Sequence, residues 1–142
     1  MNDPKARLHE LLLKDLAELK LRQIAENYRE VLDEAARKNT SMLEVLASLI
    51  AAEVTARRQR AIERRIRQAK LPPRKTLEDY DFTFPKRIPK QKILRLFDCE
   101  FVSQQQCAIL IGRTGTGKSH LLNALGYTAC EKGISVRSRA GD

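Results

Sequence analysis

A glycine-rich stretch toward the end of the sequence combines residue types that bind phosphate. Residues 112–119 read GRTGTGKS and fill the pattern G-x-x-x-x-G-K-[ST]. Glycines let the main chain approach an anion closely, and backbone N–H groups at a helix N-terminus then surround it. Lys118 would reach the β- and γ-phosphates of a nucleotide, and the Ser119 hydroxyl would ligate a bridging Mg²⁺. The candidate cofactor-binding residues are Gly112, Arg113, Thr114, Gly115, Thr116, Gly117, Lys118 and Ser119. A glycine turn that binds nothing is the weaker interpretation, because both the spacing and the flanks fit a phosphate-binding loop.

The flanks of this loop predict a strand before it and a helix after it. Residues 107–111 form a short apolar run behind three glutamines, which is typical of a buried parallel strand. Leu121 and Leu125 are spaced as on one face of a helix, and Gly133 is a helix stop signal. Residues 134–136 look like a second strand. We therefore expect the first part of an α/β phosphate-loop domain, with an incomplete parallel sheet.

The composition fits a helix-rich protein of one domain, or of one domain with part of another. Of the 142 residues, 42% are hydrophobic and 32% are charged, which is unlike a disordered chain. No apolar stretch reaches the roughly 18 residues that a membrane span needs, and the first residues do not resemble a secretion signal. The three cysteines have no metal-ligand spacing and are most simply reduced thiols. These features predict a cytoplasmic protein without a membrane partner.

Most of the net charge of +9 comes from one short block. Residues 57–75 contain nine basic side chains and a single acid, Glu63, so ion pairs along a helix cannot neutralise the block. Like charges at this density repel one another unless a polyanion or an acidic partner lies alongside. Few aromatics are nearby for base stacking, which favours contact with a nucleic-acid backbone over an acidic protein surface or a solvated helix face. The predicted DNA-binding residues are Arg57, Arg58, Arg60, Arg64, Arg65 and Arg67.

Helical spacing of apolar residues predicts a helical N-terminal domain over residues 1–71. Asp3 suits the N-cap of a first helix. A second amphipathic segment either continues this helix or follows a bend near Leu21. The capping box Ser41–Glu44 predicts a further helix, which a double proline ends near residue 71. We expect the buried side of that helix to consist of Leu43, Leu46, Ile50 and Val54.

Residues 72–89 form a linker by composition, framed by prolines. Three aromatic residues alternate along it: Tyr80, Phe82 and Phe84. Such aromatics usually pin a linker to a neighbouring domain, and in nucleotide-binding proteins they also cover the base. A short helix is predicted over residues 90–97, at the start of a phosphate-loop NTPase domain that would occupy residues 90–142.

The order of these features resembles the IstB family of transposition helper ATPases. A leucine-rich helical part is followed by the arginine-rich helix, by KTLEDYDF at residues 75–82 and by GRTGTGKSH at residues 112–120. LEDYDF and the histidine after Ser119 are the more discriminating marks, because the loop alone occurs in many families. The IstB family belongs to the AAA+ proteins and is similar to the bacterial replication initiators and helicase loaders of the DnaA and DnaC type. The resemblance covers essentially the whole chain, but only the front half of what the family usually contains.

The resemblance implies an ATP-dependent helper that assembles on duplex DNA and recruits or stimulates its cognate transposase. Residues 112–119 would then hold ATP with Mg²⁺, residues 77–82 would lie near the base, and the N-terminal helices would mediate assembly of a homo-oligomer or contact with a partner. Arg113-Thr114 replaces a smaller pair that is common in the family's loop. The alternatives are a helicase loader in replication, and a shortened product that contacts DNA or a partner without nucleotide.

Hydrolysis of ATP needs an acid that holds Mg²⁺ and orients water, and a cation that offsets charge in the transition state. After Ser119 the only acids in the sequence are Glu131 and Asp142. We therefore assign no catalytic residue, and we expect a chain truncated after the phosphate loop to be inactive as an ATPase on its own. We also expect the strand at residues 107–111 to have unpaired edges.

Overall fold

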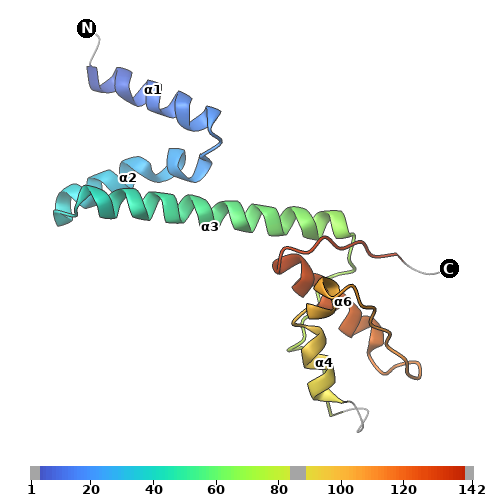
Figure 1. Cartoon of the computed structure of the whole chain (residues 1–142). Coiled ribbons are helices and arrows are strands. Elements are labelled where there is room, and N and C mark those ends of the chain that lie inside the picture. Colours follow the sequence, from blue (N-terminus) through green and yellow to red (C-terminus); the bar gives the residue numbers. More distant parts are fainter. Residues whose placement is uncertain (1–3, 84–88, 140–142) are drawn as a thin grey trace. The chain divides into compact units, whose positions relative to one another are not determined.

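The computed structural model describes residues 4–83 and 89–139 and has only helices as regular elements within these ranges (Figure 1). The helices are α1 (Pro4–Glu18), α2 (Arg22–Lys38), α3 (Met42–Ala69), α4 (Lys90–Leu96), α5 (Glu100–Ser103) and α6 (Lys118–Glu131). No helix in the described part is long and apolar enough to cross a membrane. The chain forms two compact units, Met1–Arg60 and Ala61–Asp142, and α3 contributes residues to both.

The first two helices are separated by a short break. α1 ends at Glu18 and α2 begins at Arg22, and Lys20 between them has the left-handed backbone conformation, with φ at 57°. Of the two alternatives left open by the sequence, the structure has the bend near Leu21 and not one continuous helix. The N-cap predicted at Asp3 lies outside the described residues.

The capping box at the start of α3 is confirmed. The Glu44 carboxylate accepts a hydrogen bond from the Ser41 N–H at 3.0 Å, and the Ser41 Oγ accepts one from the Glu44 N–H at 3.3 Å. A hydrogen bond from the Ser41 hydroxyl holds the pKa of the Glu44 carboxyl below its ordinary value. Two backbone donors at a helix terminus are satisfied locally in this way.

The core of the unit Met1–Arg60 is small. Leu16 of α1 packs against Ile24 and Tyr28 of α2, and all three are buried. Leu49 of α3 packs against this cluster, as do Leu13, Leu21 and Ala25.

A buried carboxylate of α3 caps the start of α2. Glu53 is 3% exposed and accepts hydrogen bonds from the backbone N–H groups of Gln23 at 2.7 Å and Ile24 at 3.1 Å. Its other oxygen accepts a hydrogen bond from Arg60 at 2.8 Å. Burial by itself raises the pKa of the Glu53 carboxyl, but the bonds from Ile24, Arg60 and Gln23 outweigh it and hold the pKa below its ordinary value. Since α2 has no capping side chain of its own, this distant acid does the capping.

The apolar face that we expected to be buried on α3 is exposed. Leu43 is 76% exposed and Leu46 is 58% exposed, with Ile50 at 47% and Val54 at 41%. The helix carries a second set of residues at helical spacing, in which Leu49 and Glu53 face the core. Helical periodicity predicts such stripes but cannot say which of two stripes meets a neighbouring helix.

The unit Ala61–Asp142 is built around α6. Its core consists of Leu121 and Ala124 from α6, Ile93 and Phe97 from the region of α4, and Tyr80. The helix predicted over residues 90–97 is confirmed as α4. Figure 1 shows α4 and α6 side by side in this unit.

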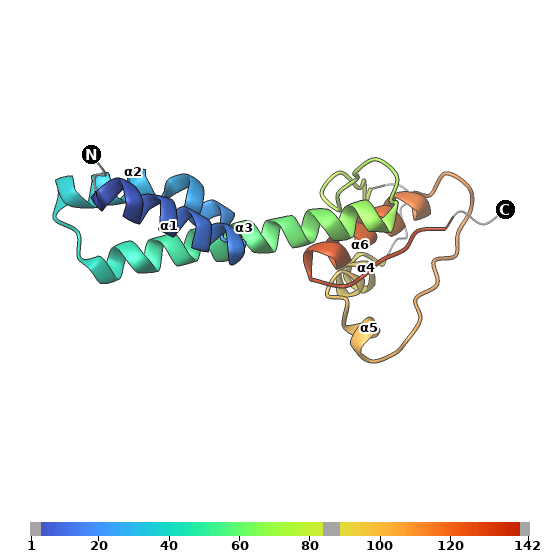
Figure 2. The ribbon, with the colours of Figure 1, turned by 90° about the horizontal axis from the view of Figure 1, so that it is seen from above.

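The prediction of an α/β fold with an incomplete parallel sheet is wrong for the described residues. Residues 107–111 and 134–136 have no strand conformation there, and Ile109 and Ile111 are 81% and 93% exposed. Figure 2 shows the segment after α5 running as an open loop up to α6. A strand needs a neighbouring strand to accept and donate its backbone hydrogen bonds, and no second strand lies beside either run in the described residues. Apolar composition alone therefore did not produce a sheet.

The end of α6 follows its sequence signal. Gly133 has φ at +90°, the Gly133 N–H donates to the Cys130 carbonyl at 3.1 Å, and the Ile134 N–H donates to the Ala129 carbonyl at 2.9 Å. This is the glycine-dependent termination that closes many helices. The stop predicted at Gly133 is confirmed.

Residues just after α3 lie along α6. The Tyr127 hydroxyl donates to the Pro72 carbonyl at 3.0 Å, and Asn123 Nδ2 donates to the Pro73 carbonyl at 2.8 Å. Leu71 sits so close to Gly126 that a Cβ there would lie 2.8 Å from the leucine Cδ2. The proline-rich stretch is thus held against the helix that follows the glycine loop. The predicted boundaries of the linker, residues 72–89, stay a prediction.

Candidate nucleotide-binding loop and basic surface

The glycine loop runs directly into α6. Gly115 and Gly117 have φ of +82° and +83°, a left-handed conformation that glycine adopts without strain. Gly117 is the N-cap of α6, and no side chain caps this helix. The first N–H groups of a helix have no acceptor within it and carry the positive end of its dipole. The junction therefore presents backbone donors to an anion.

Lys118 folds over the loop that precedes it. Its ammonium group donates to the carbonyls of Gly112 and Arg113, both at 2.7 Å, and lies 3.5 Å from Thr116 Oγ1. A Cβ at Gly112 would lie only 3.1 Å from the same Thr116 oxygen. The loop is therefore narrow at Gly112, where a side chain would crowd Thr116. The Lys118 ammonium lies against the backbone of the same loop. A phosphate bound there would replace the carbonyl contacts of Lys118 with ion pairs to its oxygens.

Ser119 lies exposed in the first turn of α6, next to Lys118. Within residues 4–83 and 89–139 no group of three or more His, Cys, Asp or Glu side chains could hold a metal ion. Mg²⁺ characteristically keeps several waters and takes only one or two protein ligands besides substrate phosphates. A single serine hydroxyl beside a phosphate loop fits that manner of binding, with the ion arriving together with the nucleotide.

Residues 76–82, which we call the strap, are tied to the glycine loop by Tyr80. The Tyr80 hydroxyl donates to the Thr116 carbonyl at 2.8 Å. Its ring is 8% exposed and lies against Gly117, where a Cβ would come within 2.5 Å of the ring. Burial, and then the charge of Asp81, raise the pKa of the Tyr80 phenol above its ordinary value. The prediction that linker aromatics pin this segment to a neighbour is confirmed for Tyr80, while Phe84 lies outside the described residues.

His120 forms a second tie between the strap and α6. Its Nε2 lies 2.7 Å from the Thr76 carbonyl, and its ring meets Tyr80 edge-on, with the centroids 5.5 Å apart. The strap itself is folded by Asp79, which accepts hydrogen bonds from the Thr76 hydroxyl at 2.7 Å and the Thr76 N–H at 3.2 Å. The bond from the hydroxyl is the main reason that the pKa of Asp79 lies below its ordinary value.

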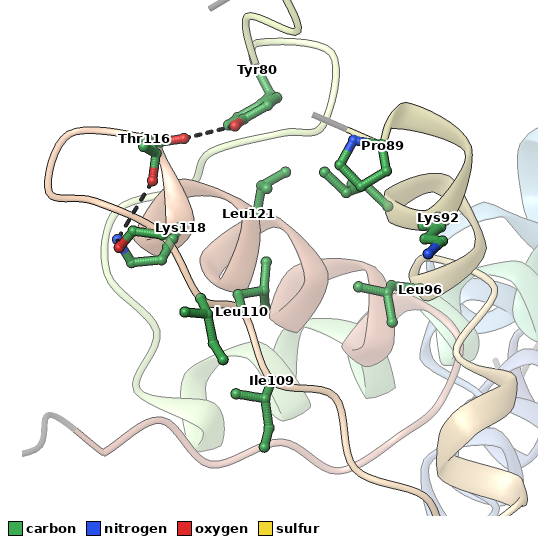
Figure 3. A pocket seen from close by; sticks show the side chains of 12 residues that line it. Tyr80, Pro89, Lys92, Leu96, Ile109, Leu110, Thr116, Lys118 and Leu121 are labelled. Carbon is green, nitrogen blue, oxygen red and sulfur yellow. Dashed lines mark hydrogen bonds between the residues drawn. The ribbon is translucent and has the colours of Figure 1, made fainter. Parts of the chain in front are cut away.

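A cavity of about 410 Å³ opens beside the loop (Figure 3). Lys118, Thr116 and Tyr80 lie at one side of it. Much of the remaining wall is apolar: Ile93, Leu96, Ile109, Leu110 and Leu121. The arrangement combines an apolar wall with a lysine and a glycine loop, which is the combination that a ligand with a flat apolar end and an anionic end requires.

The six arginines of the basic block all lie on α3. Arg57, Arg58, Arg64 and Arg67 are exposed. Arg60 is paired with the buried Glu53. Arg65 is half-buried, with its guanidinium 3.8 Å from the position that a Cβ on Gly133 would take. Of the six predicted DNA-binding arginines, Arg60 is thus held in an ion pair within its own unit and Arg65 is partly covered.

Two further arginines reach the end of α3, and our sequence analysis missed them. The Ser138 N–H donates to the Ala69 carbonyl at 2.9 Å, so residues 134–139 run beside the last turns of α3. In this segment the even-numbered residues are half-buried, whereas Arg137 and Arg139 are exposed. The alternation of the two arginines with other residues is visible in the sequence. The sequence does not show that this segment lies beside α3.

The sequence pattern that defines IstB-like ATP binding proteins matches residues 14–141. The chain belongs to the IstB-like ATP binding protein family. The match includes the glycine loop, the strap and the basic part of α3, so the family resemblance seen in the sequence is confirmed.

Three IstB-like relatives come from insertion sequences of different bacteria. The IS21 protein of Pseudomonas aeruginosa is 37% identical over 129 residues, which are 91% of this chain and 48% of the relative. The IS232 protein of Bacillus thuringiensis subsp. berliner is 32% identical, over 90% of this chain and 51% of the relative. The IS5376 protein of Geobacillus stearothermophilus is 31% identical, over 93% of this chain and 51% of the relative. All three are named as ATP-binding proteins, and the chain spans about half of their length.

Proposed function

We propose that the chain binds ATP with Mg²⁺ at the glycine loop and takes part in DNA transposition as an IstB-like helper. The observation that carries the nucleotide part is the junction at Gly117. There a left-handed glycine opens a helix without a side-chain cap, and the Lys118 ammonium lies over the loop. Membership in a family named for ATP binding supports the choice of ATP.

In this proposal the backbone N–H groups at the start of α6 surround the β-phosphate. Lys118 leaves the carbonyls of Gly112 and Arg113 and pairs with phosphate oxygens. The Ser119 hydroxyl is the protein's ligand to Mg²⁺, which when bound offsets phosphate charge. The apolar wall beside the loop would receive the base.

We further propose that the exposed arginines contact the phosphate backbone of duplex DNA. Arg64 and Arg67 on α3, with Arg137 and Arg139 beside its end, provide exposed cations within one unit. Arginine binds phosphate through its planar fork of donors, and such contacts need no reading of bases. Arg57 and Arg58, which are exposed in the unit Met1–Arg60, are further candidates for contact with the DNA backbone.

The relatives favour transposition over helicase loading, because their names place them in insertion sequences. The cognate transposase and further copies of the protein are the proposed partners of the whole protein. The alternative partner of the exposed arginines is an acidic protein surface, and the DNA-binding measurements described in the Discussion distinguish the two.

Nucleotide binding is tested by titrating Mg-ATP into the chain and into Lys118→Ala by calorimetry. Lys14→Ala, an exposed lysine of α1, is the matched control. We expect the wild type and Lys14→Ala to bind equally and Lys118→Ala to lose binding. Equal affinity for all three would refute the proposed role of the loop.

A further inference from the structure

Tyr80 contacts the peptide group of the loop that joins Thr116 and Gly117, one residue before Lys118. Its hydroxyl donates to the carbonyl of Thr116, and its ring packs against Gly117, the next residue. That carbonyl and the Gly117 N–H belong to the same peptide group. Tyr80, Thr116 and Gly117 all belong to the unit Ala61–Asp142, so the contact lies within one compact body.

The direction of this peptide group decides which way a phosphate donor points. In a trans peptide the C=O and the N–H point in opposite directions. Since Tyr80 holds the Thr116 carbonyl toward the strap, the Gly117 N–H must point away from the strap. Figure 3 shows the Tyr80 hydroxyl and the Lys118 side chain on different sides of Thr116. The Gly117 N–H is therefore directed away from Tyr80 and the strap.

Such a peptide group needs an external restraint. Glycine tolerates both signs of φ, so a peptide next to Gly117 can rotate at small cost. Gly115 precedes the pair and has a positive φ as well. A rotated peptide would direct the Thr116 carbonyl, a partial negative charge, at the phosphate. The contacts made by Tyr80 oppose that rotation.

We propose that Tyr80 is a positioning residue of the phosphate loop, which holds the Thr116–Gly117 peptide so that the Gly117 N–H faces a bound phosphate. This inference rests on the proposed nucleotide binding. It also couples the strap to the ligand, because the loop geometry that binds phosphate is the one in which Tyr80 is engaged. The bond between His120 and Thr76 holds the strap in place for this contact.

The chain offers a matched control for removal of the Tyr80 hydroxyl. Tyr127 also donates its hydroxyl to a backbone carbonyl, that of Pro72 at 3.0 Å, in the same unit but away from the loop. Tyr80→Phe and Tyr127→Phe each lose one such bond and keep the ring. In Mg-ATP titrations we expect Tyr80→Phe to bind about fivefold more weakly, the factor that corresponds to one ordinary hydrogen bond. Tyr127→Phe should bind as the wild type does, although it loses a bond of the same kind.

A spectroscopic readout tests whether Tyr80 itself responds to a phosphate at the loop, whereas the comparison with Tyr127→Phe separates positioning from general support of the fold. The sequence has no tryptophan and three tyrosines, so tyrosine emission reports on Tyr28, Tyr80 and Tyr127. Inorganic tripolyphosphate with Mg²⁺ is a probe of the loop alone, because it has no base. We expect it to change the emission of the wild type and of Tyr127→Phe, and to leave that of Tyr80→Phe unchanged. A change of equal size in Tyr80→Phe contradicts the inference.

The failure of this inference differs from the failure of nucleotide binding itself. If the wild type binds, Lys118→Ala does not, and Tyr80→Phe matches the wild type in both affinity and emission response, the loop binds phosphate without help from Tyr80. If Lys118→Ala binds as the wild type does, the proposed nucleotide site is wrong and the inference falls with it.

Discussion

The ring of Tyr80 lies so close to Gly117 that a methyl group on this glycine would come within 2.5 Å of the tyrosine Cε2 atom. The two residues are far apart in the sequence, and the hydrogen bond from the Tyr80 hydroxyl to the carbonyl of Thr116 adds to the contact. The glycine of the G-K-[ST] motif therefore serves two purposes. It adopts the left-handed backbone that opens α6, and it leaves room for the ring that braces the loop.

The contact predicts that Gly117→Ala destabilises the unit Ala61–Asp142 more than Gly115→Ala does. Both positions have a positive φ, which costs alanine roughly 1–2 kcal/mol. Only at Gly117 does the new Cβ also collide with a neighbour, since nothing lies within 4 Å of a Cβ at Gly115. Denaturant unfolding without nucleotide measures the difference. Tyr80→Ala should relieve part of the loss in the double variant, and strict additivity would contradict the clash.

The exposed arginines predict a salt-dependent affinity for duplex DNA that depends on two segments of the chain. Each lost phosphate contact should lower the slope of log affinity against log salt by about 0.9. We expect a reduced slope in Arg64→Ala/Arg67→Ala and again in Arg137→Ala/Arg139→Ala, measured by fluorescence anisotropy over a range of salt concentrations.

The control for these variants is Lys38→Ala, which also removes a cation but lies at the end of α2 in a pair with Glu34. It should leave the slope unchanged. If only the α3 variant lowers the slope, residues 134–139 do not take part in the contact. If neither pair changes it, the arginines do not bind the DNA backbone, and an acidic protein surface becomes the partner to test.

Glu53→Gln should destabilise the unit Met1–Arg60 at neutral pH. The variant loses the charged acceptor of two backbone N–H groups at the start of α2 and the partner of Arg60. Hydrogen bonds to charged groups contribute about 1.5–3 kcal/mol each, so a loss on the order of 2 kcal/mol is expected. The free energy of unfolding from denaturant titrations measures it, with the exposed Glu26→Gln of α2 as control.

The same carboxylate predicts a dependence on pH. The folded pKa of Glu53 lies below its ordinary value of 4.5. Its stabilisation is therefore fully present above that value and is lost as the pH falls through the folded pKa. The difference in unfolding free energy between the wild type and Glu53→Gln should shrink on acidification. A difference that stays constant from neutral to acidic pH would mean that Glu53 does not act as a charged cap.

The three cysteines should differ in reactivity. Cys107 is exposed, whereas Cys99 and Cys130 are buried. Burial is the main cause that raises the pKa of both buried thiols, which lowers their thiolate fraction further. We expect one thiol to react rapidly with a thiol-specific reagent in the folded chain, and all three after denaturation. Retention of the fast phase in Cys107→Ser would show that another thiol is accessible.

Much of the local structure could be predicted from the sequence because it depends on neighbouring residues. The reciprocal hydrogen bonds of Ser41 and Glu44 and the termination of α6 at Gly133 each involve residues a few positions apart. The left-handed conformation at the start of α6 falls on Gly117 for a local reason too, since glycine adopts it without strain. These features need no distant partner.

Other features were decided by contacts between distant residues. The apolar run at residues 107–111 formed no strand in the described structure, because strand pairing depends on a neighbouring strand. On α3, Leu49 faces the core and Leu46 does not, a choice that rests on where α1 and α2 lie. Glu53 became a cap for a helix that begins 31 positions earlier, at Arg22.

The sequence by itself determined that a glycine-rich loop opens a helix and that a second segment carries dense positive charge. Backbone freedom and charge belong to the residues themselves, so they can be read without a fold. Only the tertiary structure decided that Tyr80 braces the loop and that Arg137 and Arg139 run beside the end of α3. Packing and hydrogen bonds between distant segments depend on how the chain folds back on itself, and no local pattern records that.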